Sequence, residues 1–192
     1  MKKNVLITLG VILAIVVIIV GWLWGSYNKL VTANEQVDNQ WAQVETQYQR
    51  RFDLIPNLVN AVKGAMGQEQ KVFGDLAAAR ENYSGAQTVN AKAEAASQVE
   101  SSLGRLIAIM ENYPQLKSID TVQTLMAQLE GTENRISVER GRFNDDVKAY
   151  NIMIKQIPMN FIAGPFGYTD KAYFQVAPVA ADAPKVDLNL AQ

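Results

Sequence analysis

The chain has 192 residues, of which 48% are hydrophobic and 19% are charged, and its formal net charge is -1. This length allows one domain with an appendage or two small domains, and the near-neutral charge argues against a nucleic-acid-binding protein. The sequence contains no His and no Cys, which excludes zinc and haem sites built on those residues, thiol nucleophiles, disulfides and His-based catalytic triads.

The most apolar part of the sequence is residues 5–24, a run of 20 residues without a charge. A helix of this length is about 30 Å long, which matches the hydrocarbon core of a bilayer. A cleaved signal peptide has a shorter apolar region of about 7–15 residues, followed by small residues. This run instead ends in Trp22 and Trp24, with Tyr27 just beyond, and such aromatic residues are typical of a membrane interface. We therefore predict a retained anchor over residues 1–26 that contacts the lipid bilayer through residues 5–24.

The charges on either side of the apolar run indicate its orientation. Lys2 and Lys3 precede the run, and only Lys29 follows it closely. Because the cytoplasmic flanks of membrane helices carry the excess of Lys and Arg, we predict a single membrane pass with a cytoplasmic N-terminus and an extracytoplasmic body.

Beyond the anchor, apolar residues recur at steps of three and four, which is the period of an amphipathic helix. Four helices are predicted, over about residues 27–51, 53–83, 88–113 and 119–156. None of them could bury its apolar face alone, and short connections favour antiparallel neighbours. The predicted fold is therefore all-α, with a single N-terminal transmembrane helix, an up-down antiparallel four-helix bundle over residues 27–156 and an irregular C-terminal tail.

Individual residues set the predicted helix boundaries. Asp53 is predicted to be the N-cap of the second helix, with Pro56 in its first turn, and Ser118 is the candidate cap of the fourth helix. Gly131 and Gly141 each cost about 1 kcal/mol relative to Ala, which weakens the prediction of one unbroken fourth helix.

The sequence after the fourth predicted helix changes in composition. Residues 157–178 are apolar and punctuated by Gly and Pro, and we predict that they pack on the base of the bundle; residues 179–192 are predicted to be a flexible tail. In an up-down bundle the fourth helix returns toward the membrane, so Phe161, Ile162 and Phe166 should lie near the lipid. These side chains could insert into the membrane interface, or they could cover the bundle base or a neighbouring subunit.

Arg50 and Arg51 are adjacent and are followed by Asp53. One interpretation is an anion or partner site beside the N-terminus of the second helix. The alternative, which we favour, is a structural corner in which Asp53 caps the helix and an arginine pairs with a neighbouring helix.

Carboxylates are numerous along the predicted helices, but they fall mainly outside the apolar stripes, as expected of a solvated face. Di-iron bundles need a Glu-x-x-His motif, which a chain without His lacks. Paired acids could still perform acid–base chemistry, as in glycosidases. The sequence has no Gly-rich phosphate-binding motif. We therefore predict no catalytic, cofactor-binding or metal-binding residues, no cofactor and no small-molecule substrate.

Several segments resemble the LemA family, in matching order along almost the whole chain. They read YNKLV at 27–31, QYQRRFDLIPNLVNAVKG at 47–64, AAAR at 77–80, GRFNDDVKAYN at 141–151 and IPMNFIAGPFGYTDKAYF at 157–174. The second helix of the family commonly carries a His-Glu pair, where this chain has Gln68 and Glu69. The resemblance implies a small bacterial membrane protein with one N-terminal span and a helical bundle, and it implies no established enzymatic activity. Family members are often encoded near membrane proteases and envelope-stress proteins.

The predicted function is a non-catalytic, membrane-anchored helical scaffold or adaptor of the bacterial envelope, which forms a homo-oligomer or contacts another membrane protein. The candidate contact residues are Arg50, Arg51, Asp53, Phe161, Ile162 and Phe166. The genetic association suggests an alternative, a regulatory or sensor subunit of a membrane protease or envelope-stress system. A carboxylate-based enzyme is a third possibility, and it would need a concave site with perturbed carboxyl groups.

Overall fold

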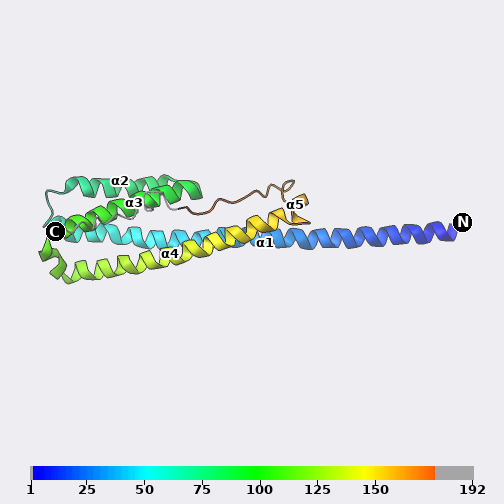
Figure 1. Ribbon diagram of the computed structural model, residues 1–192, viewed down its shortest axis with the longest axis horizontal. Coiled ribbons are helices and arrows are strands. Elements are labelled where there is room, and N and C mark those ends of the chain that lie inside the picture. Colours follow the sequence, from blue (N-terminus) through cyan, green and yellow to red (C-terminus); the bar gives the residue numbers. More distant parts are fainter. Residues whose placement is uncertain (1, 176–192) are drawn as a thin grey trace, which may run out of the picture. The chain divides into compact units, whose positions relative to one another are not determined.

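The structure, a computed structural model, describes residues 2–175 (Figure 1). Its helices are α1 (Lys2–Lys63), α2 (Gln70–Gly85), α3 (Val89–Met110), the short 3-10 helix η1 (Pro114–Ser118), α4 (Asp120–Lys155) and α5 (Met159–Ile162). No strand occurs within residues 2–175. The predictions of an all-α fold and of one long, apolar N-terminal helix are therefore confirmed. The flexible tail predicted for residues 179–192 lies outside the described residues.

The chain separates into two compact units. Unit 1 comprises residues 1–45 and 138–173, and unit 2 comprises residues 46–137 and 174–192. The helices α1 and α4 contribute residues to both units. The up-down four-helix bundle predicted over residues 27–156 is not established by this division and stays a prediction.

Unit 1 begins with the apolar part of α1, which is long and apolar enough to cross a membrane. From Leu6 to Trp24 every side chain except that of Leu23 is exposed, and the two end residues of this stretch are 69% and 70% exposed. The burial changes at Ser26, which is only 7% exposed. The exposed stretch therefore ends within one helical turn, although the helix itself continues.

The remainder of unit 1 is built from the next part of α1 and the last part of α4. Its buried apolar residues on these two helices are Leu30, Val37, Val44, Phe143, Val147, Tyr150 and Ile154. The rings of Trp41 and Phe143 lie 5.2 Å apart. Polar residues on α1 and α4 are also joined by hydrogen bonds. Gln36 Nε2 donates to Asp146 Oδ1 at 2.9 Å, and Gln40 Nε2 donates to Glu139 Oε2 at 2.7 Å.

Unit 2 contains α2 and α3, which lie side by side (Figure 1). The start predicted near Thr88 for the third helix is confirmed, because Thr88 is the N-cap of α3 and its Oγ1 accepts from Ala91 N at 3.2 Å. Aromatic rings join α1 to α2: Phe52 lies 4.7 Å from Tyr83, and Tyr48 lies 5.4 Å from it.

The turn predicted between residues 51 and 53 is wrong, because α1 continues unbroken to Lys63. Asp53 is therefore not an N-cap; it lies inside α1, where its Oδ1 accepts from Gln49 Nε2 at 2.8 Å. The chain turns instead over residues 64–69, between α1 and α2.

Pro56 also lies inside α1, where a proline costs about 3 kcal/mol relative to Ala. The helix persists because its apolar face is buried on both sides of this residue. The buried side chains around it are Phe52, Ile55, Leu58 and Val62. Burial of such a side chain contributes about 1.5–3 kcal/mol, so four of them outweigh the cost of the proline.

The predicted extent of the fourth helix is confirmed to within one residue at each end, and α4 is unbroken across Gly131 and Gly141. Ser118 is not its N-cap, however. It is the last residue of η1, and its Oγ donates to the carbonyl of Gln115 at 2.8 Å. The Ser118 hydroxyl is therefore hydrogen-bonded to the preceding turn and does not cap α4.

The two candidate caps differ in a measurable way. We expect Thr88→Ala to lower the free energy of unfolding by about 1 kcal/mol, because it removes a real N-cap. Asp53→Ala should have a clearly smaller effect, because Asp53 is exposed within a helix interior. Chemical denaturation of the purified protein in detergent, followed by circular dichroism, would measure both. Equal losses of unfolding free energy in the two variants would contradict the placement of Asp53 inside a continuous α1.

Candidate functional site

The first candidate site lies where the exposed part of α1 ends. Trp22 and Trp24 are 56% and 70% exposed, and Tyr27 is half-buried. The ring of Tyr27 lies 5.0 Å from Phe166 and 6.4 Å from Tyr168. The structure thus brings together Tyr27 and Phe166, which the sequence placed in the interface belt and in the apolar loop respectively.

The loop that carries Phe166 has an inner and an outer side. Met159 and Ala163 are buried, whereas Ile157, Phe161 and Phe166 are 73%, 68% and 61% exposed. We refer to these three exposed residues as the apolar rim. Ile162 lies between the two groups and is half-buried.

A tight turn after α5 holds Phe166 beside Tyr27. Tyr168 N donates to the carbonyl of Ala163 at 2.9 Å, and Gly167 N donates to that of Gly164 at 3.0 Å. Gly167 has a φ of 81°, in the left-handed region that costs other residues about 1–2 kcal/mol. Glycine at this position therefore lets the chain reverse directly after Phe166.

The chain that follows this turn is fastened to both long helices of unit 1. Asn151 is 8% exposed; its Nδ2 donates to the carbonyl of Lys171 at 2.9 Å, and its Oδ1 accepts from Lys171 N at 2.8 Å. The ammonium group of Lys171 pairs with Asp38 of α1 and lies 5.6 Å from the ring centroid of Tyr150. Sequence reasoning missed Asn151 and Lys171, although a polar residue directly after the last aromatic residue of the α4 stripe was a usable signal.

The phenol of Tyr150 does not act as a base in this environment. Burial raises the pKa of its phenol above the ordinary value, and the neighbouring Tyr168, Asp38 and Asp170 raise it further. The phenol therefore stays protonated at neutral pH.

The second candidate site surrounds Arg51, which is 8% exposed. Its Nη1 pairs with Glu133 of α4 and lies 3.9 Å from Glu100 Oε1 of α3. Tyr48 Oη donates to the same Glu100 oxygen at 3.3 Å. Arg51 thus pairs with carboxylates of neighbouring helices within unit 2, as the structural interpretation of the arginine pair expected.

Arg50 and Asp53 do not belong to this cluster, because both are exposed. Successive helical residues are about 100° apart around the axis, so Arg50 lies about 100° and Asp53 about 160° around α1 from Arg51. A helix end predicted between Arg51 and Asp53 led to the interpretation of the three residues as one group. The carboxylate partners Glu100 and Glu133 were not predicted, although each directly follows a buried residue of its helix.

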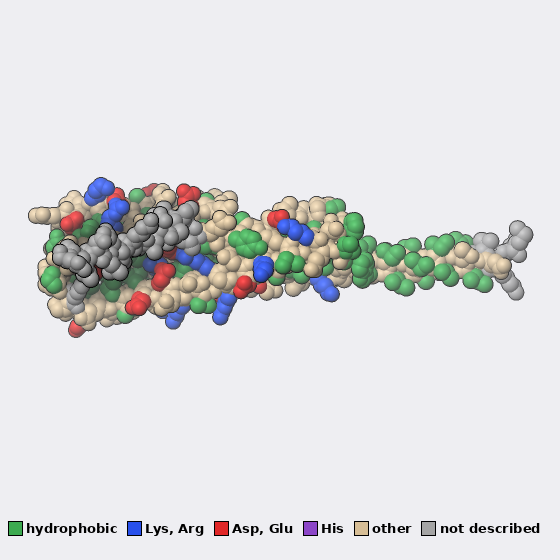
Figure 2. Space-filling model, viewed as in Figure 1, with side chains coloured by type: hydrophobic (Ala, Val, Ile, Leu, Met, Phe, Trp, Pro, Cys, Tyr) green, Lys and Arg blue, Asp and Glu red, His purple; other side chains and the backbone are tan. Residues whose placement is uncertain are grey.

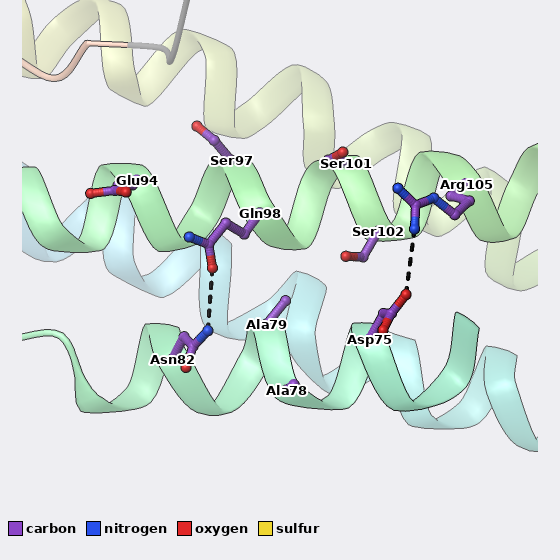
Figure 3. Close-up of a pocket in the computed structure, with 10 residues that line it drawn as sticks. All are labelled: Asp75, Ala78, Ala79, Asn82, Glu94, Ser97, Gln98, Ser101, Ser102 and Arg105. Atoms are coloured by element: carbon purple, nitrogen blue, oxygen red, sulfur yellow. Dashed lines mark hydrogen bonds and ion pairs between the residues drawn. The ribbon is translucent and has the colours of Figure 1, made fainter. Parts of the chain in front are cut away.

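The third candidate is a groove of about 520 Å³ between α2 and α3 (Figure 3). Two polar bridges cross it: Asn82 Nδ2 donates to Gln98 Oε1 at 3.2 Å, and Arg105 Nη1 pairs with Asp75 Oδ2 at 3.4 Å. Figure 3 shows small side chains between these bridges, including Ala79.

Two acidic residues, Asp75 and Glu94, line the groove. Asp75 is paired with Lys71 at 3.3 Å as well as with Arg105. Among the described residues, no group of three or more Asp or Glu side chains is arranged to hold a metal ion.

These features define a helical protein with one helix long and apolar enough to span a membrane. The model of the LemA family matches residues 40–188, and the chain belongs to the LemA family. A comparison with curated proteins finds no match.

The Arg51 cluster can be tested by a matched pair of variants. Removing one partner of a buried ion pair costs about 3–5 kcal/mol, so Arg51→Ala should lower the free energy of unfolding by about 3 kcal/mol, since Glu133 is half-exposed. Arg50→Ala, one residue away and exposed, should change it by less than about 0.5 kcal/mol. Denaturant titration would measure both values, and similar losses would show that Arg51 is not the buried partner.

The turn at Gly167 can be tested in the same way. Gly167→Ala should destabilise by about 1–2 kcal/mol because alanine disfavours the left-handed conformation. Gly164→Ala is the control, since an added methyl group would meet no atom within 4 Å at either glycine and only Gly167 has a positive φ. Hydrogen exchange at the amide of Tyr168 should accelerate in the first variant alone, and unchanged exchange would refute the proposed constraint.

Proposed function

We propose that this LemA protein is a non-catalytic, membrane-anchored helical scaffold or adaptor of the bacterial envelope, and that it self-assembles. The observation that supports this proposal is the continuity of α1. Its exposed apolar stretch, Leu6 to Trp24, continues in the same helix into a face that is buried from Ser26 to Val62. A helix of this kind joins a lipid anchor directly to a folded helical body.

The orientation is part of the proposal. The N-terminus is cytoplasmic and the helical body extracytoplasmic, because the lysines flank the apolar stretch mainly on its N-terminal side. We also propose that consecutive helices of unit 2 run up and down, since short connections join them.

The use of the acidic residues supports a structural rather than a catalytic role. Glu133 and Glu100 neutralise Arg51, and Asp146 and Glu139 accept hydrogen bonds from glutamines of α1. A general acid or base needs a side chain placed to donate a proton to the substrate or to accept one from it, whereas these carboxylates connect helices. The regulatory alternative, suggested by the genetic association of the family, shares this non-catalytic architecture.

The groove between α2 and α3 is also better suited to a protein surface than to a small molecule. Small-molecule pockets enclose most of their ligand. This groove is open to solvent along its length.

Self-assembly predicts the mass of the native particle. The intact protein, extracted from membranes in mild detergent and measured by native mass spectrometry, should contain more than one copy of the chain or a stable partner. A monomer without partners, over a range of detergents, would contradict the scaffold proposal. Co-purification of a protease would favour the regulatory alternative instead.

Membrane orientation is tested on the same protein. A reporter fused after Gln192 should be active outside the cytoplasm. Replacing Lys2 and Lys3 with Glu should reduce or invert this signal, because it removes the charge bias that sets orientation. A cytoplasmic signal from the unmodified protein would refute the proposed topology.

A further inference from the structure

The apolar rim concentrates exposed hydrophobic surface in one short segment. Ile157, Phe161 and Phe166 are all more than 60% exposed, whereas the other exposed large hydrophobic residues described beyond Trp24 are at most 52% exposed. Isolated exposed apolar side chains are ordinary, but a contiguous group marks an interaction surface.

The position of the rim points to its partner. The ring of Phe166 lies 5.0 Å from that of Tyr27, and Tyr27 is three residues, or about 4.5 Å along the helix, beyond Trp24. Figure 2 shows hydrophobic side chains along the exposed part of α1 and at the adjoining end of the packed body. The rim therefore begins where the lipid-facing stretch of α1 ends.

The charges around the rim fit a lipid surface. Residues 156–168 contain no charged side chain. The charged residues that bound this segment, Lys155 and Asp170, pair with each other at 3.0 Å. An uncharged segment with exposed aromatic residues is suited to the boundary between headgroups and acyl chains, which apolar faces enter to about 5–10 Å.

We propose that the apolar rim inserts into the membrane interface beside α1 and forms a second lipid contact of unit 1. This inference rests on the proposed membrane anchoring. One helix alone leaves unit 1 free to tilt relative to the membrane plane. A second, off-axis contact would restrict that tilt, because Phe166 is held beside Tyr27 by the turn at Gly167.

The absence of cysteine from the chain allows a direct depth measurement on the full-length protein. Single variants Phe161→Cys and Phe166→Cys, labelled with a polarity-sensitive fluorophore, would be reconstituted into phosphatidylcholine–phosphatidylglycerol vesicles. Lipids with a nitroxide quencher, placed either near the headgroup or deep in the acyl chain, report the depth of each label.

Two further variants serve as controls. Ile15→Cys lies in the middle of the apolar stretch and should be quenched most strongly by the deep nitroxide. Val138→Cys is exposed in the same unit but lies about 25 Å along α4 from Lys155, and its label should not be quenched. We expect labels at 161 and 166 to shift to shorter wavelength and to be quenched more by the shallow than by the deep nitroxide.

The outcomes separate this inference from the proposed function. If the label at 15 is quenched but those at 161 and 166 behave like the label at 138, the anchor holds and rim insertion is wrong. If the rim labels shift to shorter wavelength without quenching, and the shift is lost at low protein-to-lipid ratio, the rim contacts a second copy instead, which also overturns the inference. If the label at 15 is itself unquenched, membrane anchoring fails and the inference fails with it.

Discussion

The structure depends on one helix that meets two environments. In α1 the side chains from Leu6 to Trp24 are exposed on nearly every side, and from Ser26 onward the helix buries a single face. No turn or break marks the change, because a helix satisfies its own backbone hydrogen bonds in lipid and in water alike. The burial of that face also explains why α1 tolerates Pro56, since the packing of neighbouring apolar side chains exceeds the local cost of the proline.

Polar groups connect the helices at a few points within each unit. In unit 2, Arg51 of α1 meets carboxylates of α3 and α4. In unit 1, Asn151 pairs with both backbone polar groups of Lys171, and the side chain of Lys171 pairs with Asp38. Buried polar groups of this kind are costly unless satisfied, so they favour one particular arrangement of their helices. The carboxylates of Glu100, Glu133 and Asp38 are used in these connections.

The segment after α4 gives unit 1 its most distinctive surface. Met159 and Ala163 of this segment are buried, and the turn at Gly167 places the ring of Phe166 beside Tyr27. The same geometry leaves the apolar rim exposed beside the end of the exposed apolar stretch of α1. Membership of the LemA family agrees with a membrane-associated helical protein, and the proposed lipid contact would give this loop a role that a connector alone does not need.

Apolar periodicity in the sequence was sufficient to determine the helical fold and the extent of α4, and the uninterrupted apolar run determined the membrane-competent stretch. The start of α3 was also predicted, but the helix ends at Met110, three residues before its predicted end. The same steps of four and three also run from Tyr48 through Arg51 and Ile55 to Leu58, and they could have indicated that α1 continues. Local signals at Asp53 and Pro56 argued for a turn instead, because capping and proline rules describe one helix end at a time. Only the tertiary structure decided between them. Most of the free energy that keeps α1 helical comes from packing against residues far apart in the sequence. The same long-range packing pairs Arg51 with Glu133 and places Phe166 beside Tyr27.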